Sequence, residues 1–177
     1  MIATASQAKR KTEELTEALL KASINEEYSI LSETSPCVQR LNLELSELNV
    51  YDPVSFVGEF LLDRPEFQQL DETVVTHPTC INCKAGNVAR MQDIVGKFAK
   101  EVVLPHTVTC CDIAGDSEIF HPELHEKTLN SLQNQITKNC SIGISNSNSC
   151  EPGLSMVSGV KFGSMFHLLI KASKPKN

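Results

Sequence analysis

The feature that most constrains the fold is an alternation of short strand-like runs with amphipathic stretches through the second half of the chain. The strand-like runs fall at 72–76, which is rich in β-branched residues, and at 102–104, 141–145 and 160–162. Helix-like spacing of apolar residues marks 88–98, the stretch from 121 to 136, 150–158 and 164–172. Strands of about five residues that alternate with helices of about ten to fifteen are typical of α/β proteins. We therefore expect a three-layer α/β fold, with a mainly parallel sheet and helices on both faces.

The first part of the chain carries weaker signals. Apolar residues at three- and four-residue spacing predict a helix up to Ala22, and a β-prone run follows at 28–31. The tetrapeptide Thr34-Ser35-Pro36-Cys37 predicts a turn. Asp52-Pro53 predicts the start of a helix, with the aspartate as cap and the proline in the first turn, and Pro65 limits that helix.

Charge and hydropathy exclude two classes of partner. The net charge of the 177 residues is −6, and basic residues cluster only in short runs near the two ends. A nucleic-acid partner is therefore not expected. We find no run that approaches the roughly 18 apolar residues of a membrane helix and no secretory signal pattern. These observations predict a cytoplasmic protein whose thiols stay reduced.

Seven cysteines in such a chain need an explanation other than disulfide bonds. The adjacent pair Cys110-Cys111 is the strongest signal, because neighbouring thiols do not easily bridge each other but can both bind one metal cluster. Cys80, Cys110 and Cys150 each lie where a strand or loop passes into a predicted helix. The carboxyl ends of parallel strands meet at one edge of a sheet, so these cysteines can converge. A helix that follows Cys150 is expected to lower the pKa of its thiol. The full set is Cys37, Cys80, Cys83, Cys110, Cys111, Cys140 and Cys150.

The residues around these cysteines resemble a known family. The segments are His77-Pro78-Thr79-Cys80, Cys110-Cys111-Asp112-Ile113-Ala114-Gly115-Asp116, His121-Pro122-Glu123-Leu124 and Ser149-Cys150-Glu151-Pro152-Gly153-Leu154-Ser155. They are similar to the cysteine-rich, CCG-type iron–sulfur domain. That domain occurs in heterodisulfide reductases, in iron–sulfur subunits of glycolate and anaerobic glycerol-3-phosphate oxidation, and at the C-terminus of FAD-linked D-lactate dehydrogenases.

The resemblance implies two units, with 1–50 as the end of a first cysteine-rich unit and 51–177 as a second one. It implies an iron–sulfur cluster held by Cys80, Cys110, Cys111 and Cys150, with Cys83 and Cys140 as alternates. His121 and His125 would donate hydrogen bonds to the cluster from outside its ligand set.

The function implied by the resemblance is electron transfer within a flavin-dependent 2-hydroxy-acid dehydrogenase, acting on D-lactate. The expected partners are upstream FAD and ferredoxin-like domains of the same protein and a membrane quinone or cytochrome acceptor. The full-length protein would then attach peripherally to the inner face of the membrane. The chain itself has no dinucleotide fingerprint, so we do not expect it to catalyse dehydrogenation alone.

Two departures from the family pattern keep alternatives open. Asp112 stands where the family has a glycine after the double cysteine, and Gly153 stands where heterodisulfide reductases have a further cysteine. These changes favour a cluster-free or zinc-binding docking scaffold, and adjacent thiols also suit a thiol–disulfide module. The histidines His77, His106, His121 and His125 are each more simply explained as turn or cap residues.

Overall fold

The computed structural model of the chain describes residues 5–24, 27–45, 48–64, 67–106, 110–111, 129, 131–136 and 139–173. Its centre is a four-stranded sheet in the order β4-β3-β5-β6, in which every neighbouring pair is parallel. The strands are β3 (Leu70–His77), β4 (Ala99–Val103), β5 (Cys140–Ser145) and β6 (Phe162–Ser164). The expected α/β fold with a parallel sheet is confirmed.

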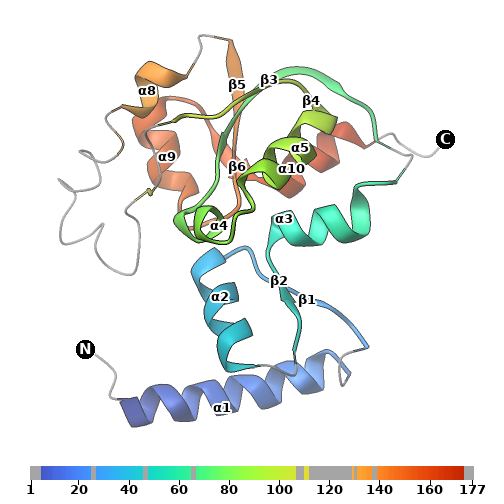
Figure 1. Ribbon diagram of the computed structural model, residues 1–177, viewed down its shortest axis with the longest axis vertical. Coiled ribbons are helices and arrows are strands. Elements are labelled where there is room, and N and C mark those ends of the chain that lie inside the picture. Colours follow the sequence, from blue (N-terminus) through green and yellow to red (C-terminus); the bar gives the residue numbers. More distant parts are fainter. Residues whose placement is uncertain are drawn as a thin grey trace.

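Helices cover both faces of this sheet (Figure 1). One face packs against α3 (Pro53–Phe56), the π-helical turn η1 (Val57–Leu61), α5 (Val88–Phe98) and α10 (Met165–Ala172). The other face packs against α8 (Leu132–Gln135) and α9 (Glu151–Ser158). Consecutive strand residues point to opposite faces, and Val74 and Val75 accordingly belong to different core clusters. The sheet thus forms the middle of three layers.

Local sequence signals fix several ends of these elements. The carboxylate of Asp52 accepts a hydrogen bond from the Ser55 amide at 2.8 Å, so the aspartate caps α3 as expected. Gly159 ends α9 with φ of +74°, a conformation that glycine adopts without strain. Gly143 lies under the ring of Phe162, where a Cβ would come within 2.5 Å of that ring. Only glycine therefore allows β5 and β6 to pair at this point.

The N-terminal region is a smaller unit. It consists of α1 (Ala5–Ala22), β1 (Ile30–Leu31), α2 (Ser35–Glu44) and β2 (Val50–Tyr51). The two short strands pair in parallel, and Val38, Leu45, Leu48 and Val50 form the buried cluster beneath them. Figure 1 shows α1 and α2 below the four-stranded sheet, with α1 at the far end.

The prediction of a turn at residues 34–37 was wrong. Ser35 begins α2, and Pro36 and Cys37 lie in its first turn. Proline is tolerated there because the amides of the first turn have no partner within the helix. The segment therefore carried a helix-start signal that was interpreted as a turn.

The boundaries of two strands also differ from the expectation. Strand β4 begins at Ala99, three residues earlier than predicted, and β6 is shifted by two residues to Phe162–Ser164. The early part of β4 contains Lys100 and Glu101, and such charged residues are common on an edge strand. The helix start expected at His121-Pro122 lies outside the described residues.

Hydrogen bonds join the N-terminal region to the sheet region. The amide of Asn148 donates to the Glu33 carbonyl oxygen at 2.9 Å, and the hydroxyl of Thr34 donates to the Asn148 side-chain oxygen at 3.3 Å. The hydroxyl of Ser164 donates to the Glu33 carboxylate. These contacts attach the segment before α2 to the loop after β5 and to the end of β6.

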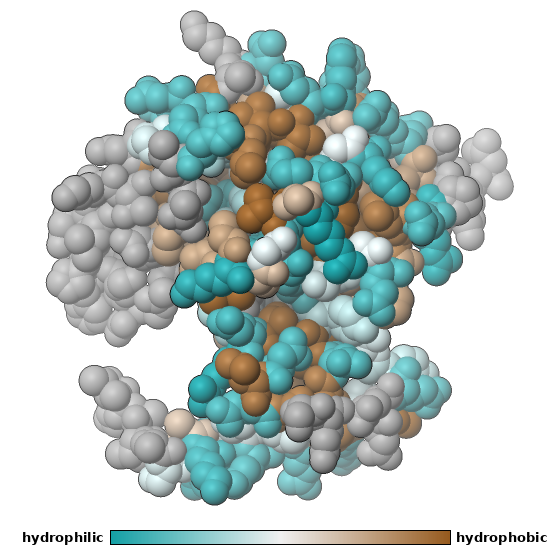
Figure 2. Space-filling view, viewed as in Figure 1, coloured by the Kyte–Doolittle hydropathy of each residue, from teal (hydrophilic) through white to brown (hydrophobic). Residues whose placement is uncertain are grey.

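The described surface mixes polar and apolar residues. Figure 2 shows apolar side chains interspersed with polar ones over both regions on the face that it displays. Within the described part of the chain, no helix combines the length and the apolar character needed to cross a membrane.

Candidate metal centre

The site lies where the sheet changes its direction of winding. From β3 the chain passes to β4 on one side, and it later returns to β5 on the other side of β3. In open parallel sheets, ligands bind at such a switch point, outside the carboxyl ends of the strands. The segments that leave β3, β4 and β5 therefore meet at one place.

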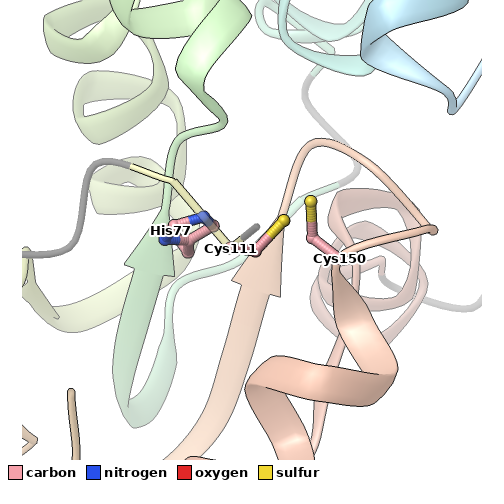
Figure 3. Close-up of side chains that lie close together, drawn as sticks. All are labelled: His77, Cys111 and Cys150. Carbon is pink, nitrogen blue, oxygen red and sulfur yellow. The ribbon is translucent and has the colours of Figure 1, made fainter. Parts of the chain in front are cut away.

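Three side chains gather there, one from each of these segments. His77 is the last residue of β3, Cys111 follows β4, and Cys150 immediately precedes α9. One ring nitrogen of His77 and the Sγ atoms of Cys111 and Cys150 all lie within 4.8 Å of one another. Figure 3 shows the three side chains close together, with His77 at the end of a strand and Cys150 at the start of a helix. The exposed fractions are 1% for His77 and 5% for each cysteine, so the group is buried.

Backbone pairing holds the residues in place. His77 is paired in register with Ser145, the last residue of β5. Past the strand ends, the amide of Thr79 donates to the Asn146 side-chain oxygen at 2.9 Å. The amide of Cys150 donates to the Ser147 carbonyl at 3.1 Å, which closes a turn before α9. The positions of His77 and Cys150 thus follow from one strand pair and one turn.

The pKa of the Cys150 thiol is raised because it hydrogen-bonds to Cys111, because it is buried, and because a charge on Cys111 or Cys110 would repel its own. A hydrogen bond with Ser149 opposes this shift without reversing it. The expectation that the helix after Cys150 lowers the pKa was therefore wrong: burial and the neighbouring thiol outweigh the helix terminus.

The next residue is also perturbed. Burial, together with the negative charge of Glu33, raises the pKa of Glu151 to about 7. Its Oε1 is buried and has no hydrogen-bond partner among the described residues. The start of α9 therefore carries less negative charge near neutral pH than its sequence indicates.

An apolar cluster surrounds the two buried cysteines. Cys111 and Cys150 belong to the core on the α8/α9 face of the sheet. Charges interact strongly in such a low-dielectric setting, and an unpaired ion there is costly. The buried members that pack with them are Val75, Leu129, Leu132, Leu154 and Phe162.

His77 is the site residue that the sequence did not reveal. The expectation that it acts as a turn or cap residue was wrong, because it ends a central strand and is buried. Neither of its ring nitrogens has a hydrogen-bond partner among the described residues. A histidine before a proline does not by itself indicate a metal ligand. The clue in the sequence was the position of His77 at the end of a predicted parallel strand.

The other expected ligands take different positions. Cys80 begins α4 (Cys80–Lys84) directly after β3 and is half-buried, and Cys110 is half-buried beside Cys111. Within the described residues, the group that meets the 4.8 Å distance contains neither of them. Cys37, in the first turn of α2, is exposed.

The two alternates are also outside the group that meets the 4.8 Å distance among the described residues. Cys83 is exposed as a residue, and its thiol donates to the Pro78 carbonyl at 3.8 Å. Partial desolvation of the sulfur, followed by the charge of Cys80, raises its pKa. Cys140 begins β5, at the end of the strand opposite Ser145, which places it roughly 16 Å away along the strand at about 3.3 Å per residue. His121 and His125 lie outside the described residues.

The donor set fits a metal ion. Thiolate and imidazole are ligands of zinc and other borderline ions. Two thiolates at about 2.3 Å from a tetrahedral zinc lie about 3.8 Å apart, so the observed group needs to contract by about 1 Å at most. Thiolates are also the ligands of iron–sulfur clusters, for which Cys80 and Cys110 would have to join the buried pair.

Comparisons with protein-family models, with curated proteins and with solved structures found no match for this chain. The structural support for a function therefore comes from the fold and from the geometry of the site.

Proposed function

We propose that this chain is an electron-transfer domain that holds an iron–sulfur cluster at the carboxyl edge of its sheet. One observation carries the proposal: Cys111 and Cys150, from segments after two different strands, meet in one buried place. Scattered cysteines that only fill the core give no reason for such a meeting at the switch point of the sheet. Cys80 and Cys110 lie at the ends of neighbouring segments and are proposed to complete the ligand set.

The chain's residues fit the requirements of such a centre. A bound cluster would accept and release single electrons. The cysteine sulfurs would hold it, the paired strand ends would fix their spacing, and the apolar cluster on the α8/α9 face would keep water from its inner side.

The wider assignment rests on the sequence resemblance. We propose that the domain passes electrons from FAD, reduced by a 2-hydroxy acid such as D-lactate, toward a quinone or cytochrome. The FAD and ferredoxin-like domains would lie upstream in the same protein, which would attach peripherally to the inner face of the membrane. The purified chain is expected to show no D-lactate dehydrogenase activity with dye acceptors, because it has no flavin-binding motif. Turnover by the chain alone would contradict this division of labour.

A second candidate is a zinc-binding domain. His77, Cys111 and Cys150 are together the three-residue ligand set of some zinc enzymes, and the family's extra cysteine is replaced by Gly153. A third candidate, a thiol–disulfide module, draws support from the hydrogen bond between Cys150 and Cys111.

Metal analysis after anaerobic preparation separates these functions. The iron–sulfur proposal predicts iron and acid-labile sulfide in equal amounts, lost in Cys111→Ser and Cys150→Ser. Cys140→Ser is the matched control, because it removes a cysteine at the opposite end of β5 and should leave both contents unchanged. Zinc without sulfide would support the second candidate. A chain mass that is lower by two hydrogens, and that a reductant restores, would support the third candidate.

A further inference from the structure

We infer that His77 is itself a metal ligand, so that the centre combines one imidazole with the thiolates of Cys111 and Cys150. This inference rests on the proposed function only in that the site must bind a metal. Sequence resemblance points to cysteine ligands alone, whereas the geometry places His77 in the group and leaves Cys80 outside it among the described residues.

The burial of His77 demands a partner. Its side chain is 1% exposed, and both ring nitrogens lack a hydrogen-bond partner within the described part of the chain. A neutral imidazole has one donor and one acceptor, and burying a polar group without a partner costs roughly 2–7 kcal/mol depending on the reference state. A metal bound to one nitrogen would replace the missing interaction with a stronger one.

Asn82, Asn146 and Glu151 each have one buried side-chain atom without a partner, but His77 is the described residue in which two such atoms are unpaired. Other polar groups close to it are paired. The Thr76 hydroxyl donates to the Val103 carbonyl at 3.3 Å and accepts from Gln92 at 2.6 Å. The Thr79 hydroxyl accepts from the Asn82 amide at 3.3 Å. Since most buried polar atoms in folded proteins are paired, an unpaired imidazole beside two thiols points to a missing ligand.

The backbone also directs the ring toward the sulfurs. His77 is anchored by its pairing with Ser145 on β5, and Pro78 follows it with a fixed φ angle. Figure 3 shows the imidazole beside Cys111, with the Cys150 sulfur next in the same direction. The ring therefore lies beside both sulfurs, with one nitrogen within 4.8 Å of them.

This ligand set selects the kind of ion and its charge. Imidazole and two thiolates suit Zn²⁺, Fe²⁺, Co²⁺ or Cd²⁺, and they do not suit Mg²⁺ or Ca²⁺, which prefer oxygen ligands. When a single divalent ion binds to these three residues, a neutral imidazole and two thiolates balance its charge, and an apolar core tolerates such a neutral group.

The test is ¹¹³Cd NMR on the full chain loaded with Cd²⁺ and labelled with ¹⁵N in histidine. We expect the cadmium resonance of the wild-type chain to be split by one ¹⁵N nucleus. His77→Gln should abolish the splitting and weaken cadmium binding by more than about tenfold, since even outer partners of metal ligands contribute that much. His77→Cys should restore the affinity without the splitting. His106→Gln and His167→Gln, at exposed positions, are the controls and should keep both.

The wild-type spectrum decides the outcome even if His77→Gln fails to fold. Bound cadmium without ¹⁵N splitting, splitting that persists in His77→Gln, or no cadmium binding would each overturn the inference. Splitting in a chain that assembles no iron and sulfide would support the histidine ligand and contradict the proposed electron-transfer function. A chain that assembles iron and sulfide, but whose cadmium form shows no splitting, would support the electron-transfer function and contradict the histidine ligand.

Discussion

The two regions of this molecule differ in the size of their buried cores, and the candidate metal centre lies in the larger region. In the sheet region, from α3 to α10, thirteen buried residues among those described form one cluster. In the N-terminal region, from α1 to β2, the described cluster has four. Buried apolar area is the main source of folding free energy. The sheet region should therefore fold by itself, whereas the N-terminal region should depend on its attachment through Glu33 and Thr34.

The candidate metal centre belongs entirely to the larger region. His77, Cys111 and Cys150 are positioned by the four-stranded sheet and by the turn before α9. The stable region thus supplies the rigid support that a ligand set requires. Loss of structure in the N-terminal region should leave the metal centre assembled.

The largest expected effect is that of a substitution in the main core. Phe98 is 2% exposed and packs edge-on against Phe67. Phe98→Ala should lower the free energy of unfolding by about 3–5 kcal/mol, through lost transfer energy and the cavity that remains. Urea denaturation followed by circular dichroism measures this loss. Phe60→Ala, at a residue that is 38% exposed, is the control and should cost much less. Equal decreases in the free energy of unfolding of the two variants would show that the main core is not the chief source of stability.

Metal removal should have the next largest effect. The chain without metal is expected to keep its sheet, because the main core does not include the ligands. Metal at about 100 times its dissociation constant should add about 2.7 kcal/mol of stability. Thermal unfolding with Zn²⁺ and with a chelator measures the difference. Global unfolding on chelation would mean that the metal is structural, with its binding energy acting as folding energy.

A core substitution in the N-terminal region should act locally. Leu48 is 4% exposed, and Leu48→Ala should destabilise its cluster by about 2 kcal/mol, at the low end for such changes. Hydrogen exchange should then accelerate in α2, β1 and β2 and stay unchanged in β3 and β5. Acceleration of equal size in all these elements would mean that the two regions unfold as one unit.

The smallest effect is expected for a surface ion pair. Lys100 lies 2.6 Å from Asp71, and its hydrogen bond and charge lower the pKa of that exposed carboxyl. Because the folded pKa is lowered, any stabilisation is present above the ordinary aspartate pKa and is lost as the pH falls below it. Asp71→Asn should therefore change the urea midpoint at neutral pH by no more than the error of measurement, since exposed pairs contribute little. A clear decrease in the urea midpoint at neutral pH that disappears in acid would show that the stability of this edge of the sheet depends on the pair.

The sequence predicted the sheet region better than the N-terminal region, for physical reasons. Strands β3 and β5 are rich in β-branched residues, and α5 and α10 show regular spacing of apolar residues. In the N-terminal region, β1 and β2 have two residues each, which is too short for a periodic signal. Helix α2 was missed because Pro36 was taken to mark a turn.

The candidate site was predicted in part. The cysteine pattern pointed to Cys111 and Cys150, and the parallel sheet explained how they meet. His77 could not be found from spacing, because its part in the site depends on the pairing of β3 with β5. The raised pKa of the Cys150 thiol was also missed, because it depends on contact with a cysteine that is distant in the sequence.

The most direct test of the central claim is a crystal structure of the full chain, prepared anaerobically and measured at the absorption edge of its metal. The account predicts an anomalous peak within about 2.5 Å of the Sγ atoms of Cys111 and Cys150 and in contact with the His77 ring, as thiolate and imidazole bond lengths require. A peak beside Cys80 and Cys83 instead, or a disulfide between Cys111 and Cys150 with no metal, would contradict it.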